Sequence, residues 1–382
     1  MKSVVLHTKV TVNTREFHVH TGSVSEKNVI LSEIFEHGKF VSSKQIVFEE
    51  RDARDEASKM RFLKNKATNL HKNTIEEINM LFYIQSKIKP LKLYLPHFKL
   101  GTVLLYRNII PEAIDSFKIC LENKPDFIPG YIMLGKCYIG MAAFSDAVGI
   151  LLKGFKLNSE YPDLANTLGV ALIMNKDYQK ATSILQQALK KNPEFDEANF
   201  NLGIALFRST IDVTDQQDKS VVPPRVIRYL KSLVKQERYQ AEQWQNLFEN
   251  TLGILTDGTL NEILAQLENL QLKLITHVKI DPIIESFYLK FMYGGRELPY
   301  AELESYENRI WALAEERNNF ADFWNEMGTI HIIQCRHLFL KAVNEFERAV
   351  ELNNNYAEAM KNLELIQNIK KGFLILLRAI LR

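Results

Sequence analysis

Two histidines near the N-terminus have a spacing that is compatible with metal binding. His18 and His20 alternate in the segment FHVHT, which is rich in β-branched and aromatic residues, so on a strand their side chains point to one face. Imidazole nitrogens bind zinc and other transition metals, but such a site needs at least a third ligand. The sequence alone makes no third ligand evident, and we therefore predict that these histidines bind no metal.

Other reactive residue patterns are missing from the sequence. The chain has 3 Cys and no CxxC motif, so neither a disulfide framework nor a cysteine zinc site is expected. It also contains no GxxxxGK[ST], GxGxxG, HExxH or GxSxG pattern. We predict that the protein is not an enzyme and needs no cofactor.

The composition is that of an ordinary folded protein. Of 382 residues, 46% are hydrophobic and 25% are charged, and 48 Lys+Arg against 46 Asp+Glu give a net charge of +2. Such a near-balance argues against a nucleic-acid-binding protein. The sequence has no apolar run of the roughly 18 residues that a membrane span needs, and its first residues lack the apolar core of a signal peptide. We expect a soluble, cytoplasmic chain.

A regular spacing indicates how the elements are organised. The pair Leu-Gly recurs every 34 residues, at Leu100-Gly101, Leu134-Gly135, Leu168-Gly169 and Leu202-Gly203. An alanine follows the first three pairs with the same period, as Ala113, Ala147 and Ala181. Such regularity is far beyond chance at ordinary Leu and Gly usage, so the chain contains an internal repeat.

The repeat resembles the tetratricopeptide (TPR) family, whose pattern is W-x2-L-G-x2-Y, then A-x3-F, then P. The three alanines are followed at the fourth position by Phe117, Leu151 and Leu185, and Pro125 and Pro193 end the first and third repeats. The resemblance covers 94–208 and, in a further unit at 321–365, Trp324, Met327-Gly328, His331, Ala342 and Phe346. It implies helical hairpins stacked in a right-handed solenoid, in which the repeated glycine lets paired helices lie close together.

The repeat register also assigns the remaining reactive side chains. Cys120 and Cys137 fall at positions that pack between helices, so we interpret them as core residues rather than redox centres. Cys335 falls in a predicted turn between helices. His331 occupies a packing position, which favours a structural role.

In TPR proteins, particular positions of each first helix line a concave groove that usually binds a peptide. The resemblance places these residues there: Phe98, Thr102, Leu105, Tyr106, Ile132, Lys136, Ile139, Asn166, Val170, Ile173, Phe200, Ile204 and Phe207. TPR domains that capture a terminal carboxylate have Lys and Asn where this chain has Phe98 and Thr102, so a carboxylate ligand is not implied.

The predicted groove is mostly apolar, and two interpretations follow. Either the chain's own helices cover it, or it is a slot for an amphipathic helix or an extended apolar peptide. We favour the slot, because long exposed apolar surfaces usually mark interaction sites. At least three of its large side chains should then be partly exposed, from the set Phe98, Tyr106, Ile132, Phe200 and Phe207.

The segments before the repeats have a different pattern. Residues 1–50 predict a small antiparallel β-meander of four strands, with turns at Asn13-Thr14-Arg15 and Glu36-His37-Gly38. Four short strands are marginal alone, so one face should dock on a helix that begins near Asp52. Residues 51–93 predict a leading helical hairpin, with Thr74-x-x-Glu77 as a capping box.

The segments after the repeats are helical with less regular patterns. Residues 209–224 predict a loop ending in Pro223-Pro224, after which the fourth repeat resumes near Val226. Residues 225–320 are either degenerate repeats, which we favour, or a helical insert. Turn or cap residues within them are Asp257-Gly258, Asp281-Pro282 and Gly294-Gly295.

The C-terminal segment 366–382 predicts a helix that is apolar on most of its surface, with a basic stripe of Lys371, Arg378 and Arg382. It is too short to cross a bilayer of about 30 Å. Three interpretations remain: a cap on the last repeat, an interface with a partner or a second copy, or a helix in a membrane interface. We favour the cap, because the preceding helix brings the segment to an otherwise open end of the solenoid.

Together these patterns predict a mainly α protein, a TPR-type helical-hairpin solenoid with a small N-terminal antiparallel β-meander. We expect a non-enzymatic scaffold whose concave groove binds a protein or peptide partner and no nucleic acid. A homo-oligomer is left open, and a membrane surface is a less favoured partner. The alternative functions are an accessory module of an enzyme and a membrane-peripheral assembly factor.

Overall fold

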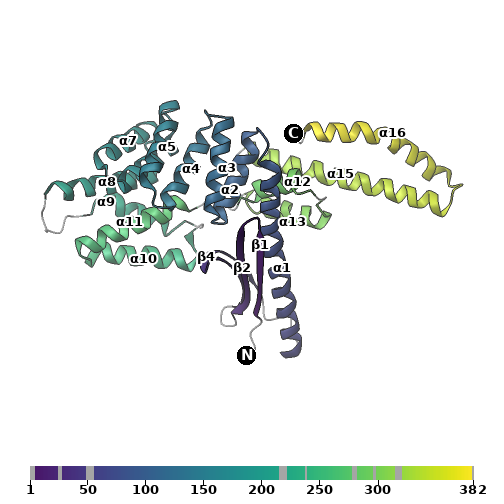
Figure 1. Ribbon diagram of the computed structural model, residues 1–382, viewed down its shortest axis with the longest axis horizontal. Coiled ribbons are helices and arrows are strands. Elements are labelled where there is room, and N and C mark those ends of the chain that lie inside the picture. The colour runs from purple at the N-terminus through teal and green to yellow at the C-terminus, as the bar shows by residue number, and fades with distance from the viewer. Residues whose placement is uncertain are drawn as a thin grey trace. The chain divides into compact units, whose positions relative to one another are not determined.

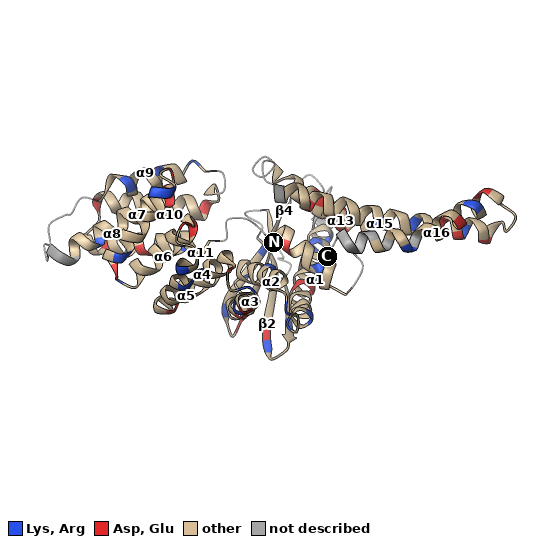
Figure 2. Ribbon diagram, turned by 90° about the horizontal axis from the view of Figure 1, so that it is seen from above, with Lys and Arg blue, Asp and Glu red and all other residues tan. Residues whose placement is uncertain are grey.

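The computed structural model of the chain describes residues 5–24, 28–48, 56–214, 222–236, 239–277, 282–295, 298–314 and 321–380. These residues form two compact units, Met1–Pro282 and Ile283–Arg382 (Figure 1). Acidic and basic residues are interspersed along the helices of each unit (Figure 2), as the balanced composition leads one to expect.

The N-terminal strands form the predicted antiparallel meander. Strands β1 (Val5–Val12), β2 (Arg15–Val24), β3 (Val29–Glu36) and β4 (Lys39–Val47) are hydrogen-bonded in sequence order. One face of the sheet packs against helix α1 (Glu56–Ile88), where Phe17, Val19 and Ile30 are fully buried. This alternation of buried and open positions fixes the register, because a one-residue slip would expose the whole apolar set.

The segment after the sheet is one helix and not the predicted hairpin. Helix α1 continues for 33 residues, and Thr74 lies inside it, where its hydroxyl donates a hydrogen bond to the Leu70 carbonyl. The predicted capping box at Thr74 is therefore wrong. The physical reason is that the segment 56–88 contains neither Gly nor Pro, so nothing in it favours a chain reversal.

The repeat region consists of helical hairpins (Figure 1), and the bounds of their helices have the predicted period. The first helices are α2 (Tyr94–Tyr106), α4 (Ile128–Gly140), α6 (Pro162–Met174) and α8 (Asp196–Thr214), and they begin 34 residues apart. The second helices are α3 (Ile110–Asn123), α5 (Phe144–Leu157), α7 (Tyr178–Lys191) and α9 (Pro224–Leu233). Helix α9 thus resumes the fourth repeat close to the predicted Val226.

The repeated glycines allow the paired helices to touch. A Cβ on Gly135 would lie 2.6 Å from Leu151 Cγ, and one on Gly169 would lie 2.5 Å from Leu185 Cγ. In the fourth repeat, a Cβ on Gly203 would lie 2.8 Å from Val226 Cγ2 of α9. Any side chain at these positions would force the helices apart, which confirms the role that the repeat pattern assigned to glycine.

Each of the first three hairpins turns on a residue in the left-handed backbone region. These residues are Asn108 (φ 57°), Ala142 (φ 57°) and Lys176 (φ 64°), again 34 residues apart. None of them is a glycine, so each turn holds some backbone strain.

Ion pairs hold the sheet and α1 against the first hairpin. Arg15 of β2 binds both Glu36 of β3 and Glu112 of α3, and all three side chains are mostly buried. Glu77 of α1 accepts a hydrogen bond from Arg107 at 2.8 Å and pairs with Lys44 of β4. The meander and α1 therefore cover the N-terminal end of the repeats, as a cap on a solenoid must.

Two further helices complete the first unit. Helix α10 (Glu242–Asp257) ends at the predicted Asp257-Gly258 turn, and α11 (Leu260–Thr276) begins with a capping box between Thr259 and Glu262. Helix α10 contains a Leu-Gly pair, Leu252-Gly253, but the pair is out of register with the 34-residue period, and a Cβ on Gly253 would meet no described atom within 4 Å. Helix α11 contains no such pair.

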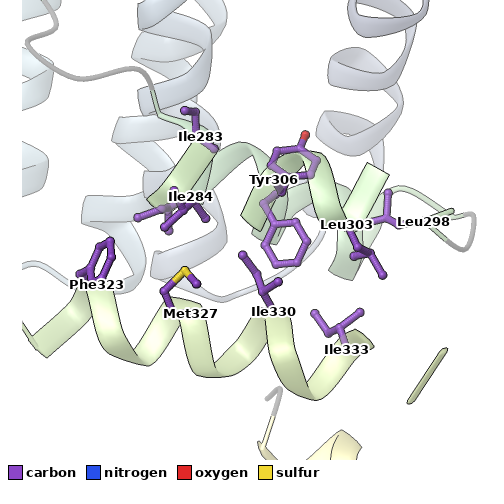
Figure 3. Packing of buried hydrophobic residues seen from close by; sticks show 11 residues of the cluster. Ile283, Ile284, Leu298, Leu303, Tyr306, Phe323, Met327, Ile330 and Ile333 are labelled. Carbon is purple, nitrogen blue, oxygen red and sulfur yellow. The ribbon is translucent and has the colours of Figure 1, made fainter. Parts of the chain in front are cut away.

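The second unit contains α12 (Ile283–Tyr293), α13 (Tyr300–Trp311), α15 (Ala321–Leu352) and α16 (Ala357–Ile380). Its core lies between α12, α13 and α15, where Phe287, Tyr306, Phe323 and Ile330 are buried (Figure 3). Helix α12 ends before Gly294-Gly295 as predicted, whereas Asp281 lies outside the described residues.

The predicted TPR hairpin at 321–365 is not present in this form. Helix α15 runs unbroken through Cys335, which is exposed on the helix rather than in a turn. The true repeat turns contain an asparagine or follow a glycine, but 334–337 reads Gln-Cys-Arg-His, with neither glycine nor asparagine. The chain reverses only after Leu352, between α15 and α16.

Candidate functional site

The candidate site is the concave face formed by the first helices of the hairpins. Helix α4 packs beside α6 and α6 beside α8, so these helices line one continuous inner surface. It carries the residues that the TPR resemblance selected.

Most of that surface is covered. Buried groove residues are Leu105, Ile132, Ile139, Asn166, Val170, Ile173, Phe200, Ile204 and Phe207. Partly exposed ones are Phe98, Thr102, Tyr106 and Lys136. The expectation that at least three of the five large side chains would be accessible is wrong, because only Phe98 and Tyr106 are.

Helix α11 covers the part of this surface that α4 and α6 form, while Phe200 of α8 packs against Tyr229 of α9. Helix α11 packs against α4 and α6, and its last residue, Thr276, places Cγ2 3.4 Å from where a Cβ on Gly140 would be. Arg208 of α8 donates hydrogen bonds to the Leu264 carbonyl at 2.9 Å and to Glu268 at 3.2 Å. Helix α11 is therefore held in place by packing against α4 and α6 and by the hydrogen bonds from Arg208.

The sequence of α11 explains why it fits an apolar groove. Its buried residues recur at helical spacing and form one stripe: Ile263, Leu267, Leu270, Gln271 and Ile275. The opposite face of the helix is polar. This is the pattern of an amphipathic helix laid into a groove, with anchors about one turn apart.

A buried chain of amides sets the position of α11. Asn201 of α8 donates to Asn166 Oδ1 of α6 at 2.8 Å, and Gln271 of α11 donates to Asn201 Oδ1 at 2.7 Å. Gln271 Oε1 has no partner among the described residues, and a cavity of about 20 Å³ lies beside it. Such a cavity has room for one water, which would complete the network.

The first hairpin leaves part of the concave face open. The Phe98 ring packs edge-on against Phe127, with ring centres 5.0 Å apart, while its outer part remains accessible. Leu95, one turn earlier, is 37% exposed, and Tyr106 lies two turns later. These three side chains on α2 form what we call the open end of the groove.

The cysteines have the positions that the repeat predicted, except for Cys335. Cys120 and Cys137 are fully buried, and burial raises the pKa of each thiol to about 12. Their reactive thiolate forms are therefore disfavoured near neutral pH, as expected of core residues. His331 is exposed on α15 and does not lie in the core, but its Nε2 lies 3.3 Å from Glu307 Oε1 of the neighbouring helix α13.

The N-terminal histidines have a neighbour that the sequence reasoning missed. His7 on β1 pairs directly across the ladder with His20 on β2, and the potential ligand atoms of His7, His18 and His20 all lie within 4.8 Å of one another. The sequence contained the information needed to find His7. A hairpin turn at Asn13-Thr14 pairs residues whose numbers sum to 27, and His7 is therefore paired with His20.

Residues 366–380 of the C-terminal segment belong to α16, which packs along α15. The Phe373 and Phe339 rings have centres 4.5 Å apart, while Ile369 and Ile375 are exposed. The side chains of Lys370, Leu374 and 376–382, including the predicted basic residues Arg378 and Arg382, lie outside the described residues. Among the helices described, none has an apolar stretch that could traverse a bilayer.

Comparison with solved structures finds proteins with the same type of repeat. One is the crystal structure of YrrB, described as a TPR protein with an unusual peptide-binding site. Its sequence is 18% identical to this chain, the TM-score is 0.31, and the match covers 50% of this chain and 91% of YrrB. MamA is 23% identical with a TM-score of 0.27, over 43% and 91% of the two chains. The TPR domain of P58(IPK) is 15% identical with a TM-score of 0.28, over 71% and 76%.

No protein-family model matches the sequence, and neither does any curated protein. The hairpins α2 to α9 have the TPR fold by their own geometry: a 34-residue period, a glycine contact within each hairpin, and first helices that line a concave face.

Proposed function

We propose that the protein is a non-catalytic interaction scaffold whose TPR concave face binds an amphipathic helix or apolar peptide from a partner. The observation that carries the proposal is α11, which lies on this face and is held by apolar anchors and by the Asn201 network. A face that accepts an amphipathic helix of its own chain has the shape and chemistry to accept another.

The partner would bind at the open end of the groove. Leu95, Phe98 and Tyr106 present a row of accessible apolar surface on α2, beside the part that α11 covers. Aromatic residues of this kind supply large contact area at little cost in side-chain entropy and are common binding hot spots.

A scaffold is also favoured over an enzyme by the cavities near the described helices. The amide-lined cavity under α11 has room for about one water. A shallow, open surface depression of about 430 Å³ is lined by one side of α13 and the residue after it, among them Glu304 and Arg309. An active site usually gathers reactive groups from several elements in a deep cleft.

The test is selection of helical amphipathic peptides from a display library on the full chain, followed by affinity measurement with variants. Phe98→Ala and Tyr106→Ala should each weaken binding by about 2 kcal/mol, as for aromatic hot spots. Leu152→Ala is the control, because Leu152 is 37% exposed, as Leu95 is, but lies on the second helix α5. Thermal melts of each variant establish that the fold is kept.

Two results would contradict the proposal. One is that no peptide is selected under conditions in which the chain is folded. The other is that selected peptides bind the Phe98 and Tyr106 variants as tightly as the unmodified chain, which would place the binding surface elsewhere.

A further inference from the structure

Three histidines gather on the face of the sheet that points away from α1. His7 on β1 stands directly across from His20 on β2, and His18 lies two residues from His20 on the same face. His7 and His20 are exposed and His18 is half-buried. The two hydrogen-bonded strands fix the positions of all three Cβ atoms, so only side-chain torsions remain adjustable.

The spacing of the nitrogens is close to that of a tetrahedral metal site. Zinc binds imidazole nitrogen at about 2.0–2.1 Å, which puts two nitrogens of a tetrahedron roughly 3.3 Å apart. His7 Nε2 and His18 Nδ1 are 3.1 Å apart, and all three ligand atoms lie within 4.8 Å of one another. Small rotations of the rings are enough to bring the third nitrogen into place.

A carboxylate supports one of these rings from behind. His18 Nε2 lies 3.0 Å from Glu16 Oε1, which leaves Nδ1 facing His7. A histidine that binds a metal through one nitrogen and donates from the other to a carboxylate is a recurring arrangement, which fixes the ring and raises its basicity. Glu16 is itself held by Lys9, with Nζ and Oε2 2.5 Å apart.

The other two rings are packed against neighbours. His20 meets Phe35 of β3 edge-on, with ring centres 5.4 Å apart. His7 lies over His20, with centres 4.4 Å apart. Glu33 pairs with His20 in the β2–β3 ladder and so adds a negative charge to the same face.

We propose that His7, His18 and His20 form a binding site for a late first-row divalent metal ion, of which Zn²⁺ is the type, with Glu16 as the residue that positions His18. Three imidazoles suit zinc, copper and nickel, whereas magnesium and calcium require oxygen ligands. Because His7 and His20 face solvent, a water or an external ligand takes the fourth position. This site is separate from the concave face and does not depend on its function.

The experiment is calorimetric titration of ZnCl₂ into the full chain, prepared without a histidine tag. We expect one ion per chain. His7→Ala and His20→Ala should each lower the affinity by more than Glu16→Gln does, and Glu16→Gln should lower it about 10- to 100-fold. His37→Ala is the matched control, because His37 is exposed in the β3–β4 turn, outside the cluster. MgCl₂ should give no binding.

A spectroscopic reading distinguishes this site from loose surface binding. Co²⁺ in a tetrahedral site absorbs strongly in the visible range, and this band should appear in the unmodified chain and in His37→Ala but not in His7→Ala. Zinc should also raise the melting temperature of the first two but not that of His7→Ala. Equal zinc affinity in the unmodified chain and in His7→Ala, or binding of magnesium as tight as zinc, would overturn the proposal.

Discussion

The segments 94–233 and 321–352 carry the same repeat pattern but have different structures. In the first, each Leu-Gly pair faces a second helix, and Gly169 lies where even a Cβ would touch Leu185. In the second, Met327-Gly328 lies in the 32-residue helix α15, and a Cβ on Gly328 would meet no described atom within 4 Å. Phe346, which should cover that glycine, stays 18 residues further along the same helix, about 27 Å away.

The difference shows that the repeat residues do not by themselves make a hairpin. The glycine and the aromatic residue are useful only once the chain has reversed between them, and the reversal depends on the turn. Lys176 and its equivalents adopt a left-handed backbone there, while Cys335 at the corresponding position remains helical. The first position of the repeat pattern differs in the same way: His97 in the first segment is 2% exposed, but Trp324 in the second is 50% exposed.

The largest expected effect comes from replacing the glycines. Gly169→Leu should lower the free energy of unfolding by about 3 kcal/mol, because the side chain has no space between α6 and α7. Gly328→Leu should instead raise it by about 0.8 kcal/mol, because leucine favours a helix over glycine. Denaturant unfolding followed by circular dichroism measures both, and a similar loss in the two variants would show that α15 forms a hairpin after all.

The next effect concerns the covered concave face, a feature that only the first region has. Asn201→Ala should cost about 1–3 kcal/mol, because it leaves the amides of Asn166 and Gln271 buried without their partner. Thr329→Ala on α15 is the control and should be nearly neutral, because among the described residues the Thr329 hydroxyl donates to the Asn325 carbonyl of its own helix. Chemical denaturation gives both values, and a neutral Asn201 variant would mean that α11 is not seated by this network.

Replacing Lys176 and Cys335 by glycine should change the stability of the protein in opposite directions. Lys176→Gly removes the strain of a left-handed lysine and should stabilise the protein by about 1 kcal/mol. Cys335→Gly should destabilise it by about 1 kcal/mol, because glycine is unfavourable inside a helix. Thermal melts of the two variants side by side check this, and stabilisation by Cys335→Gly would indicate a turn at 335.

The smallest expected effect is a pH dependence from His97. Burial lowers its pKa, partly opposed by a hydrogen bond to the Leu91 carbonyl. The unfolded chain keeps a histidine pKa of about 6.5 and so takes up a proton first as the pH falls, which means that stability is present above that pH and is lost below it. His97→Gln should therefore lose less stability than the unmodified chain between about pH 7.5 and pH 5.5. An equal loss in both proteins would exclude His97 as a source.

Much of the fold could be predicted from the sequence because it depends on local signals. The 34-residue period gave the hairpins α2 to α8, and the turn residues near Asn13 and Gly38 gave the meander. The continuity of α1 could have been read from its lack of Gly and Pro. The candidate site was predicted less well, because its accessibility depends on α11. This helix begins at Leu260, more than sixty residues beyond the third repeat in the sequence, and has no repeat pattern. His7 was missed because pairing across a hairpin was not combined with the alternation of His18 and His20.

The central claim is that α11 occupies the concave face of the repeats, as a partner helix would. A disulfide between Gly140→Cys and Thr276→Cys, in a Cys335→Ser background, tests it most directly, because these positions are in van der Waals contact. The account predicts rapid, nearly complete cross-linking of the full chain under mild oxidation, seen by mass spectrometry, and none when Gly149→Cys on α5 replaces Gly140→Cys. Free thiols at 140 and 276 in a folded protein would contradict the account.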